Sequence, residues 1–398
     1  MSAPADTNPT TTAPADDAAA KAAAAFDVVL TKYKTAGEIT SKAIKAVIQA
    51  AKEGATVGEL CKVGDDAVKE GTGSVYKSDK KMAKGSAFPT TISINHIICN
   101  NAPLSTSESY SQALKADDVV KIQLGSHIDG YPAIAAETIV VGASSAKPVS
   151  GVTADAIKAA YVGAEAAIRL LKPGTITTEV AKEVEKAIKE FDVKVVEGMQ
   201  TNQVDKDVID GKKKIVLNPD PQQRPDASKL EEGDVFAVDV SVTTGKDGKT
   251  KTDDSATTIY KKTGSTYLLK MATSRKVFSE IQKRAGAFPF QLGLLEDSER
   301  GRTMGVRECV NHNLITSFEV SYDGTPGAVT TQFFFTAIVS AKGAIRVTPA
   351  PSWYSAEVVK SEKEVKDEAL KKMLEQPVRQ AGKKAAKKAA AASAAPSA

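Results

Sequence analysis

Histidine and cysteine, the side chains that most often hold metals or act as nucleophiles, are few and widely spaced in this chain. The histidines are His96, His127 and His312, and the cysteines are Cys61, Cys99 and Cys309. His96 and Cys99 lie close in sequence, but without a third ligand they make a weak metal or nucleophile pair, and a packed strand end explains them. The cysteines show neither zinc spacing nor a disulfide framework, which suits a reducing compartment. Gly125 has no other glycines at the spacing of a phosphate-binding loop, so we expect no nucleotide-binding loop here.

Lysine and arginine gather in short clusters, although the formal net charge is only +4. The clustered residues are Lys77, Lys80, Lys81, Lys84, Lys212, Lys213, Lys214, Lys261, Lys262, Lys270, Arg275, Lys276, Arg300, Arg302, Lys383, Lys384, Lys387 and Lys388. Any single cluster is also compatible with an ordinary solvated surface. Gathered on one face, they would neutralise phosphates and release counterions, giving salt-dependent binding that is largely independent of sequence. No zinc finger, RNP motif or recognition helix is visible, so we expect recognition of nucleic-acid shape and backbone.

The composition indicates a globular protein with a sizeable core. The chain has 398 residues, of which 42% are hydrophobic and 26% charged. No apolar run approaches the roughly 18 residues that a membrane helix needs, so we expect no membrane association. Residues 1–25 lack large apolar side chains and are predicted to be disordered. Residues 377–398 form a basic Ala/Lys-rich tail, either disordered or a solvated helix.

Helices and strands alternate between these ends. The expected elements are helices at 33–51, 56–70, 273–284 and 305–318, and strands at 87–99, 117–142 and 329–348. Thr56 followed by Glu59 predicts a capping box at the start of the second helix. Asp129-Gly130 predicts a hairpin turn, because both central positions of that turn need positive φ.

The chain also repeats itself. Lys52-Glu53-Gly54 and the helix after it are matched by Lys172-Pro173-Gly174 and the helix after it, 120 positions later. The segment from Leu114 to Leu124 is matched by the segment from Leu230 to Val240, 116 positions later. Two echoes in the same order predict two α+β halves packed as pseudo-symmetric partners with a cleft between them. Gln123 and Asp239 are then equivalent positions facing that cleft.

Residues from about 30 to 376 resemble the type-two methionine aminopeptidase superfamily, whose fold is called pita-bread. Within it, the chain is most similar to the proliferation-associated, ErbB-receptor-binding protein group, which includes the curved-DNA-binding proteins of fungi. The segments that carry the resemblance are Gly85–Asn95, Val196–Met199, Val208–Gly211, Val235–Val240, Thr257–Lys261 and Tyr354–Val365. The resemblance implies a pita-bread domain over 26–376, with halves at about 26–150 and 151–350 and a helical insertion at about 262–326.

The active enzymes hold two metals with two aspartates, a histidine and two glutamates, and bind substrate with a second histidine. The resemblance places these positions, in that order, at Gln123, Ile134, Met199, Asp239, Phe334 and Asn100. Such side chains cannot clamp two hard cations and activate water. A small alignment slip does not rescue the site, because residues 128–311 contain no histidine. We therefore expect no catalytic residues, no metal and no cofactor.

The prediction is a catalytically inactive protein that binds structured RNA. The resemblance implies association with the large ribosomal subunit and its rRNA near the tunnel exit, with roles in ribosome biogenesis, translation or growth control. It also implies cytoplasmic and nuclear or nucleolar residence, and protein partners at the insertion or tail. The alternatives are a nuclear DNA-binding or transcription cofactor role and a residual metallo-aminopeptidase. Leu370 to Leu374 resembles a nuclear-receptor docking motif, although one amphipathic helical turn explains it equally well.

Overall fold

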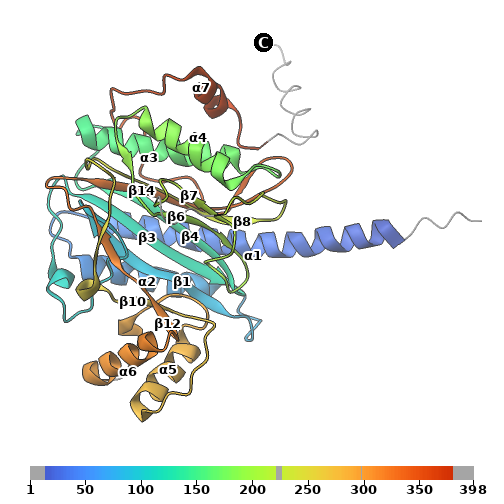
Figure 1. Cartoon of the computed structure of the whole chain (residues 1–398), viewed down its shortest axis with the longest axis vertical. Helices are drawn as coiled ribbons and strands as arrows, with labels where there is room; N and C mark the ends of the chain where they lie inside the picture. Colours follow the sequence, from blue (N-terminus) through green and yellow to red (C-terminus); the bar gives the residue numbers. More distant parts are fainter. Residues whose placement is uncertain (1–13, 221–225, 297, 380–398) are drawn as a thin grey trace, which may run out of the picture.

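A twisted nine-stranded sheet forms the centre of the protein (Figure 1). The structure is a computed structural model that describes residues 14–220, 226–296 and 298–379. The strands, in spatial order, are β1 (Lys84–Ile94), β3 (Val119–Ile128), β4 (Tyr131–Val140), β14 (Thr330–Ile338), β8 (Val235–Thr243), β6 (Gln200–Val204) and β7 (Lys214–Val216). In addition, β15 (Ile345–Arg346) pairs with β14, and β5 (Lys194–Val195) pairs with β8.

Two pairs of helices cover one face of this sheet. They are α1 (Pro14–Ala50) with α2 (Val57–Ser74), and α3 (Gly151–Leu170) with α4 (Thr177–Lys189). Side chains alternate between the faces of a strand. Ile122 and Leu124 of β3 are in the core beneath α1 and α2, and Val238 and Val240 of β8 are in the core beneath α3 and α4. Odd-numbered residues of β3 and β8 therefore point to the opposite face, which we call the cleft face.

The sequence repeat is a structural repeat. Gly54 donates its N–H to Leu114 O at 2.8 Å, and Gly174 donates its N–H to Leu230 O at the same distance. Both glycines have positive φ, 86° and 89°, which favours glycine at the turn between the helices. The predicted capping box of Thr56 is present, with the Thr56 hydroxyl accepting from the backbone N–H three residues later. The prediction of two pseudo-symmetric halves is confirmed.

The halves meet between β4 and β14, where threonine hydroxyls replace most of the backbone ladder. Thr138 Oγ1 donates to Gln332 O at 2.8 Å and accepts from Gln332 N at 2.7 Å. Thr336 Oγ1 makes the same pair of bonds with Ile134, at 2.9 and 3.0 Å. The Ala136–Phe334 register pair lies between them in both strands. This threonine seam is thus itself two-fold symmetric.

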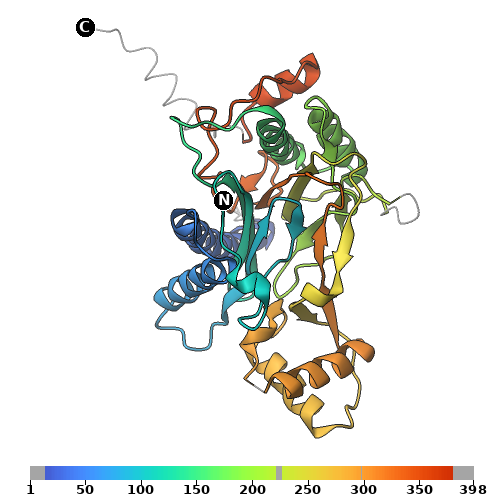
Figure 2. The same cartoon turned by 90° about the vertical axis from the view of Figure 1, so that its left-hand side faces the viewer.

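The helical insertion forms a small subdomain at one end of the molecule (Figures 1 and 2). It contains α5 (Ala272–Arg284), β11 (Phe290–Gln291) and α6 (Glu299–Asn311), between β10 (Ile259–Lys262) and β12 (Ile315–Phe318). Val277, Ile281, Cys309 and Leu314 belong to its own apolar core. The other elements are the small sheet of β2 (Ile97–Cys99), β13 (Val320–Tyr322) and β9 (Lys251–Asp253), and the short helices η1 (Glu108–Ser111), η2 (Asp254–Ala256) and η3 (Leu292–Leu294).

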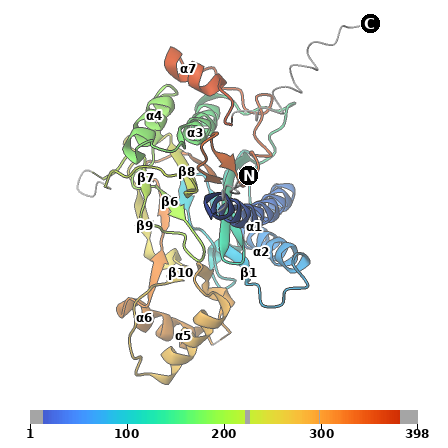
Figure 3. The same ribbon diagram turned by 90° about the vertical axis from the view of Figure 1, so that its right-hand side faces the viewer.

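Helix α7 (Glu368–Glu375) lies at the opposite end of the molecule from the insertion (Figure 3). Leu370 is 1% exposed in the core that α3 contributes to, and Met373 and Leu374 pack against the same core. The apolar side chains of the docking-like segment are therefore used inside the protein.

The structure corrects two predicted boundaries. We expected a helix over 305–318, but α6 ends at Asn311, and Asn313, with φ of 54°, starts a turn into β12. The β-branched residues Ile315 and Thr316 pair with β10 instead. We also expected disorder through residue 25, but α1 begins at Pro14. Residues 1–13 and the tail lysines Lys383, Lys384, Lys387 and Lys388 lie outside the described residues.

Two further expectations can be compared with the structure. The hairpin turn at Asp129 and Gly130 is confirmed, since their φ angles are 52° and 81°. Within the described ranges, none of the helices has the length and apolar character required to span a bilayer.

Candidate functional site

On the cleft face, the two positions related by the repeat are joined by a glutamine. Gln332 Nε2 donates to Gln123 Oε1 at 3.2 Å and lies 3.1 Å from both carboxylate oxygens of Asp239. Ser241 Oγ donates to Asp239 Oδ1 at 2.8 Å. Gln123 and Asp239 are each 7% exposed, so the network is closed to bulk water. An amide nitrogen, a donor that cannot bind a cation, thus lies between the two positions.

Asp239 is the one predicted metal-ligand position that carries an acid. Burial raises the pKa of its carboxyl to about 6, while the hydrogen bonds from Gln332 and Ser241 oppose that rise. Gln332 Oε1 is buried and has no hydrogen-bond partner among the described residues. The carboxylate is therefore held by two donors but is costly to keep charged.

Apolar side chains occupy two more of the positions. Ile134 on β4 and Phe334 on β14 contact the same apolar cluster, which also contains Phe88, Ile209 and Phe288. Phe334 lies opposite Asp239 in the β8–β14 ladder. Two of the predicted metal-ligand positions are therefore part of this apolar cluster or pack against it.

The remaining two positions also make structural contacts. Met199 packs against Ile98, Cys99 and Val196. Asn100, in a left-handed conformation with φ of 66°, donates its side-chain amide to Glu319 O at 2.9 Å. Neither residue is directed to a group of acids or imidazoles.

Acids near the second ligand position have other partners. Glu137 accepts hydrogen bonds from the backbone N–H groups of Ser352 and Trp353, at 2.7 and 3.1 Å. Asp129 forms ion pairs with Lys32 and Lys206, at 2.6 and 3.2 Å. No cluster of three or more His, Cys, Asp or Glu side chains suited to a metal occurs in the part of the chain that the structure describes.

The two histidines nearest the cleft are packed against aromatic rings. The ring of His127 stacks on Phe288 with centroids 4.3 Å apart, and its Nδ1 accepts the N–H of Gly130 at 3.3 Å. Burial lowers the pKa of His127 to about 4, so it is neutral at physiological pH. His96 lies in the turn between β1 and β2, where it is exposed and its ring meets that of Tyr322 edge to face at 6.2 Å. The buried His127 is therefore a packing group, whereas the prediction of a packed strand end is wrong for His96.

The predicted nucleic-acid residues are distributed over three described regions. Lys77, Lys80, Lys81 and Lys84 lie between α2 and the start of β1; Lys212, Lys213 and Lys214 lead into β7; and Lys261, Lys262, Lys270, Arg275, Lys276, Arg300 and Arg302 lie in or beside the insertion. The structure brings the first and third regions to one cavity, which Lys84 and Arg302 both line.

Some of these basic side chains form ion pairs or hydrogen bonds within the protein. Lys213 pairs with Glu231 and Asp234, at 2.9 and 2.8 Å. Lys261 pairs with Asp210 at 2.9 Å. The guanidinium of Arg275 donates to the carbonyls of the loop before α5. By contrast, Lys80, Lys81, Lys212, Lys270 and Arg300 are exposed.

Comparison with known proteins identifies the family. Residues 31–264 match the family described as metallopeptidase family M24. The chain belongs to metallopeptidase family M24. It is 40% identical over 349 residues to the curved DNA-binding protein of Schizosaccharomyces pombe, covering 87% of this chain and 90% of that protein. It is 39% identical over 323 residues to the ERBB-3 binding protein 1 of Solanum tuberosum, covering 80% and 81%.

A solved structure of a thermophilic Arx1 is similar in fold and in sequence. The TM-score is 0.82 at 33% identity, and the match covers 89% of this chain and 99% of Arx1. This M24 protein therefore has the pita-bread fold with a helical insertion. The expected membership in the branch of curved-DNA-binding and ErbB-3-binding proteins is also confirmed.

Sequence reasoning missed Gln332, which joins the two halves of the cleft network. Its signal was present, because it lies two residues before Phe334 and therefore on the same face of β14. The cavity shared by the α2–β1 region and the insertion was also missed, since its walls are far apart in sequence.

Proposed function

We propose that this M24 protein is a non-catalytic RNA-binding protein that associates with the large ribosomal subunit. Its basic surface would contact rRNA near the tunnel exit, and it would act in ribosome biogenesis, translation or growth control. Residence in the cytoplasm and in the nucleus or nucleolus would follow from that role. The observation that carries the non-catalytic part is the Gln123–Gln332–Asp239 network beside the apolar cluster of Ile134 and Phe334.

Two observations support the RNA-binding part. Exposed lysines and arginines lie in the α2–β1 region and on the insertion, where phosphate contacts need no base recognition. The similarity to Arx1 and to the ErbB-3-binding protein covers 89% and 80% of this chain. The insertion and the α2–β1 region would be the docking surfaces, and the cleft would remain as scaffold.

The test is sedimentation of the purified protein with large ribosomal subunits across a salt series. We expect co-migration that weakens steeply as salt rises, because phosphate contacts release counterions. Two variants, Lys80→Glu with Lys81→Glu and Lys270→Glu with Arg300→Glu, should each shift the loss of binding to lower salt.

Lys182→Glu, on α4 and exposed, is the matched control and should leave co-migration unchanged. Absence of co-migration at the lowest salt, or equal binding by all variants, would refute the proposal.

DNA binding is the second candidate, favoured by the relative that is named a curved DNA-binding protein. The same basic surface would then contact duplex phosphates. Competition decides between the two: a bent duplex that displaces the protein from ribosomal subunits at lower concentration than an rRNA fragment would favour the DNA role.

Residual metallo-aminopeptidase activity is the third candidate, favoured by the family assignment and by the acid that remains at Asp239. Metal analysis of the purified protein separates it from the first two. Stoichiometric cobalt, manganese, iron or zinc would favour it, while their absence with no hydrolysis of methionyl peptides would argue against it.

A further inference from the structure

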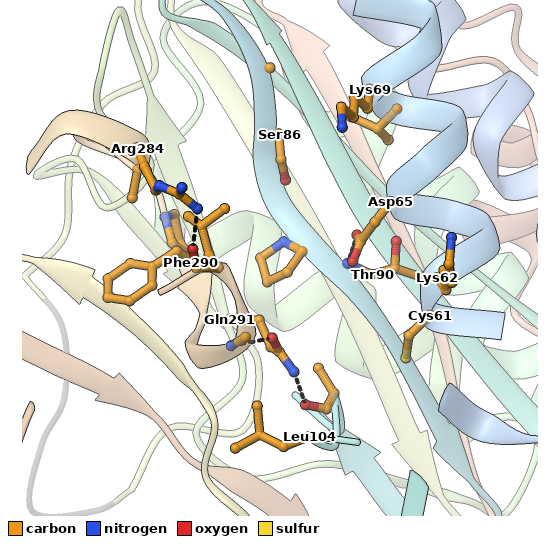
Figure 4. Close-up of a pocket in the computed structure, with 18 of the residues that line it drawn as sticks. Cys61, Lys62, Asp65, Lys69, Ser86, Thr90, Leu104, Arg284, Phe290 and Gln291 are labelled. Carbon is orange, nitrogen blue, oxygen red and sulfur yellow. Dashed lines mark hydrogen bonds between the residues drawn. The ribbon is translucent and has the colours of Figure 1, made fainter. Parts of the chain in front are cut away.

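A large open cavity lies outside the degenerate metal site. Its volume is about 880 Å³, and its walls are α2, the start of β1, the loop at 102–106 and the insertion (Figure 4). Gln291 Nε2 of the insertion donates to Ala102 O and Pro103 O, at 3.2 and 3.3 Å, and closes one end. None of the six degenerate positions lines it. We call this cavity the basic groove.

Basic side chains come from both walls of the basic groove. They are Lys62 and Lys69 of α2, Lys84 of β1, Arg284 of α5 and Arg302 of α6. Among the described residues that line the groove, the one carboxylate is Asp65, which accepts the N–H of Thr90 at 2.9 Å. The lining therefore carries an excess of positive charge.

Part of this charge is not neutralised within the protein. Lys62 pairs with Asp66, and Arg284 pairs with acids of the insertion. Among the described residues, Lys84 Nζ donates to the backbone carbonyls of Val75 and Tyr76 in the turn after α2. Within the described ranges, no acidic side chain pairs with Lys69 or Arg302. These two cations, on opposite walls, are free to bind an external anion.

The rest of the groove suits a polypeptide main chain with apolar side chains. Val68, Leu104, Phe290 and Leu294 line it; Val68 and Phe290 are buried, Leu104 is partly exposed, and Leu294 is 38% exposed. β1 is the outermost strand of the sheet, so one of its edges has no partner strand.

The free edge of β1 is short. Lys84, Gly85 and Ser86 line the groove and are partly or fully exposed. Further along, Pro89 lacks an N–H, and the N–H of Thr90 is occupied by Asp65. An added strand could therefore form backbone hydrogen bonds with residues 84–86 but not further along β1.

We propose that the basic groove binds an extended acidic segment of a partner protein. Its carboxylates would lie between Lys69 and Arg302, its apolar side chains would contact Leu104 and Leu294, and its main chain would follow the edge at Lys84–Ser86. The mode is strand addition with side-chain pockets. An extended peptide would use the apolar side chains of Leu104 and Leu294 and the strand edge as well as the cations, whereas a nucleic acid would use only the cations.

The test is fluorescence anisotropy with a short fluorescein-labelled peptide that alternates glutamate and leucine, using the full chain without ribosomes. We expect saturable binding. Lys69→Glu with Arg302→Glu should weaken it about tenfold or more, because the anion loses both partners. The exposed Lys182→Glu should leave the affinity within about twofold. Amide hydrogen exchange should slow at residues 84–86 on binding.

The inference is wrong if the peptide fails to bind, if the charge-reversed pair binds it as well as the parent chain, or if residues 84–86 gain no protection. It is also wrong if a uridine oligonucleotide displaces the peptide and a lysine–leucine peptide binds equally well. The ribosome proposal is tested at Lys80, Lys81, Lys270 and Arg300, and the Lys69–Arg302 pair includes none of these residues, so failure here leaves that proposal untouched.

Discussion

At the scale of single residues, the cleft contains one acid, Asp239, in a buried environment that favours neutral side chains. Asp239 is buried, receives hydrogen bonds from Gln332 and Ser241, and has no cation beside it among its described partners. An unpaired buried carboxylate is disfavoured in its charged form. The residue is therefore a cost to stability above its pKa, and that cost can be measured.

Asp239→Asn is expected to stabilise the protein at neutral pH. Burial raises the pKa of Asp239 from 3.8 to about 6, so the folded state prefers the neutral acid. The resulting cost is absent below about pH 4, grows between pH 4 and 6, and is complete above that, at about 3 kcal/mol. The asparagine NH₂ can also donate to the unpartnered Gln332 Oε1. Urea unfolding at a series of pH values should show a gain of about 1 to 3 kcal/mol at pH 7.5 that vanishes near pH 4.

Asp129→Asn is the control, because we expect it to change the free energy of unfolding in the opposite direction from Asp239→Asn. The hydrogen bond from Lys32 holds the pKa of Asp129 below its ordinary value, so its stabilisation is present above about pH 4 and is lost on acidification. Its removal should destabilise the protein at pH 7.5, by less than about 1 kcal/mol because the pair is partly exposed. If both variants changed stability by amounts independent of pH, the assignment of these roles would be wrong.

At the scale of elements, the repeated helix starts offer a test of the pseudo-symmetry. Thr56 caps α2 with its hydroxyl, and Glu59 returns a bond to the Thr56 N–H at 3.2 Å. In the second half, Glu179 makes the matching bond to the Ile176 N–H at 3.3 Å, but an isoleucine side chain cannot accept one.

Thr56→Ala should therefore cost about 1 kcal/mol of unfolding free energy, and Ile176→Thr should gain up to about 1 kcal/mol. Thermal or urea unfolding of each variant measures these changes. Loss of stability in Ile176→Thr would show that its half-buried apolar contacts outweigh a cap.

The docking of α7 is a second prediction at this scale. Leu370→Ala removes a fully buried side chain and should cost about 2 to 4 kcal/mol of local stability. Hydrogen exchange should report lost protection of α7, while Lys371→Ala, in a surface ion pair with Glu368, should stay within about 0.5 kcal/mol. Unchanged protection in Leu370→Ala would mean that the burial of Leu370 does not hold α7 in place, so that this side chain would be available to a partner protein.

Much of the architecture could be predicted from the sequence, because it is written in local or repeated patterns. The cap at Thr56, the hairpin at Asp129-Gly130 and the equivalence of Gln123 with Asp239 all follow from short-range chemistry or from the repeat. The contact of Gln332 with both halves could not be predicted, since it depends on which strands become neighbours. The basic groove depends in the same way on how the insertion packs beside α2. The predicted range of helix α6 was wrong because Ile315, whose apolar spacing suggested a helix, pairs with β10 in a sheet.

At the scale of the whole molecule, several apolar cores pack against the two faces of the central sheet. Apolar residues fill the cleft, and the helices cover the other face of the sheet. Ligands that bind the native state stabilise it by mass action, so removing them lowers stability. A metal-dependent relative would be expected to lose stability when its metal is removed.

We therefore expect EDTA to leave the melting temperature of this protein unchanged within about 1 °C. Differential scanning fluorimetry with and without chelator measures this, and an active methionine aminopeptidase treated in parallel is the control. A clear fall in melting temperature that added cobalt or manganese reverses would contradict a metal-free fold.

The threonine seam between β4 and β14 has a mechanical consequence. Most of the central sheet is joined by continuous ladders of backbone bonds, whereas here the two sides are coupled through Thr138, Thr336 and the single register pair between them. If a force pulled the two halves apart, few hydrogen bonds would resist it at the contact between β4 and β14. We expect rupture to begin there, so that the two pseudo-symmetric halves separate from each other before either half unfolds.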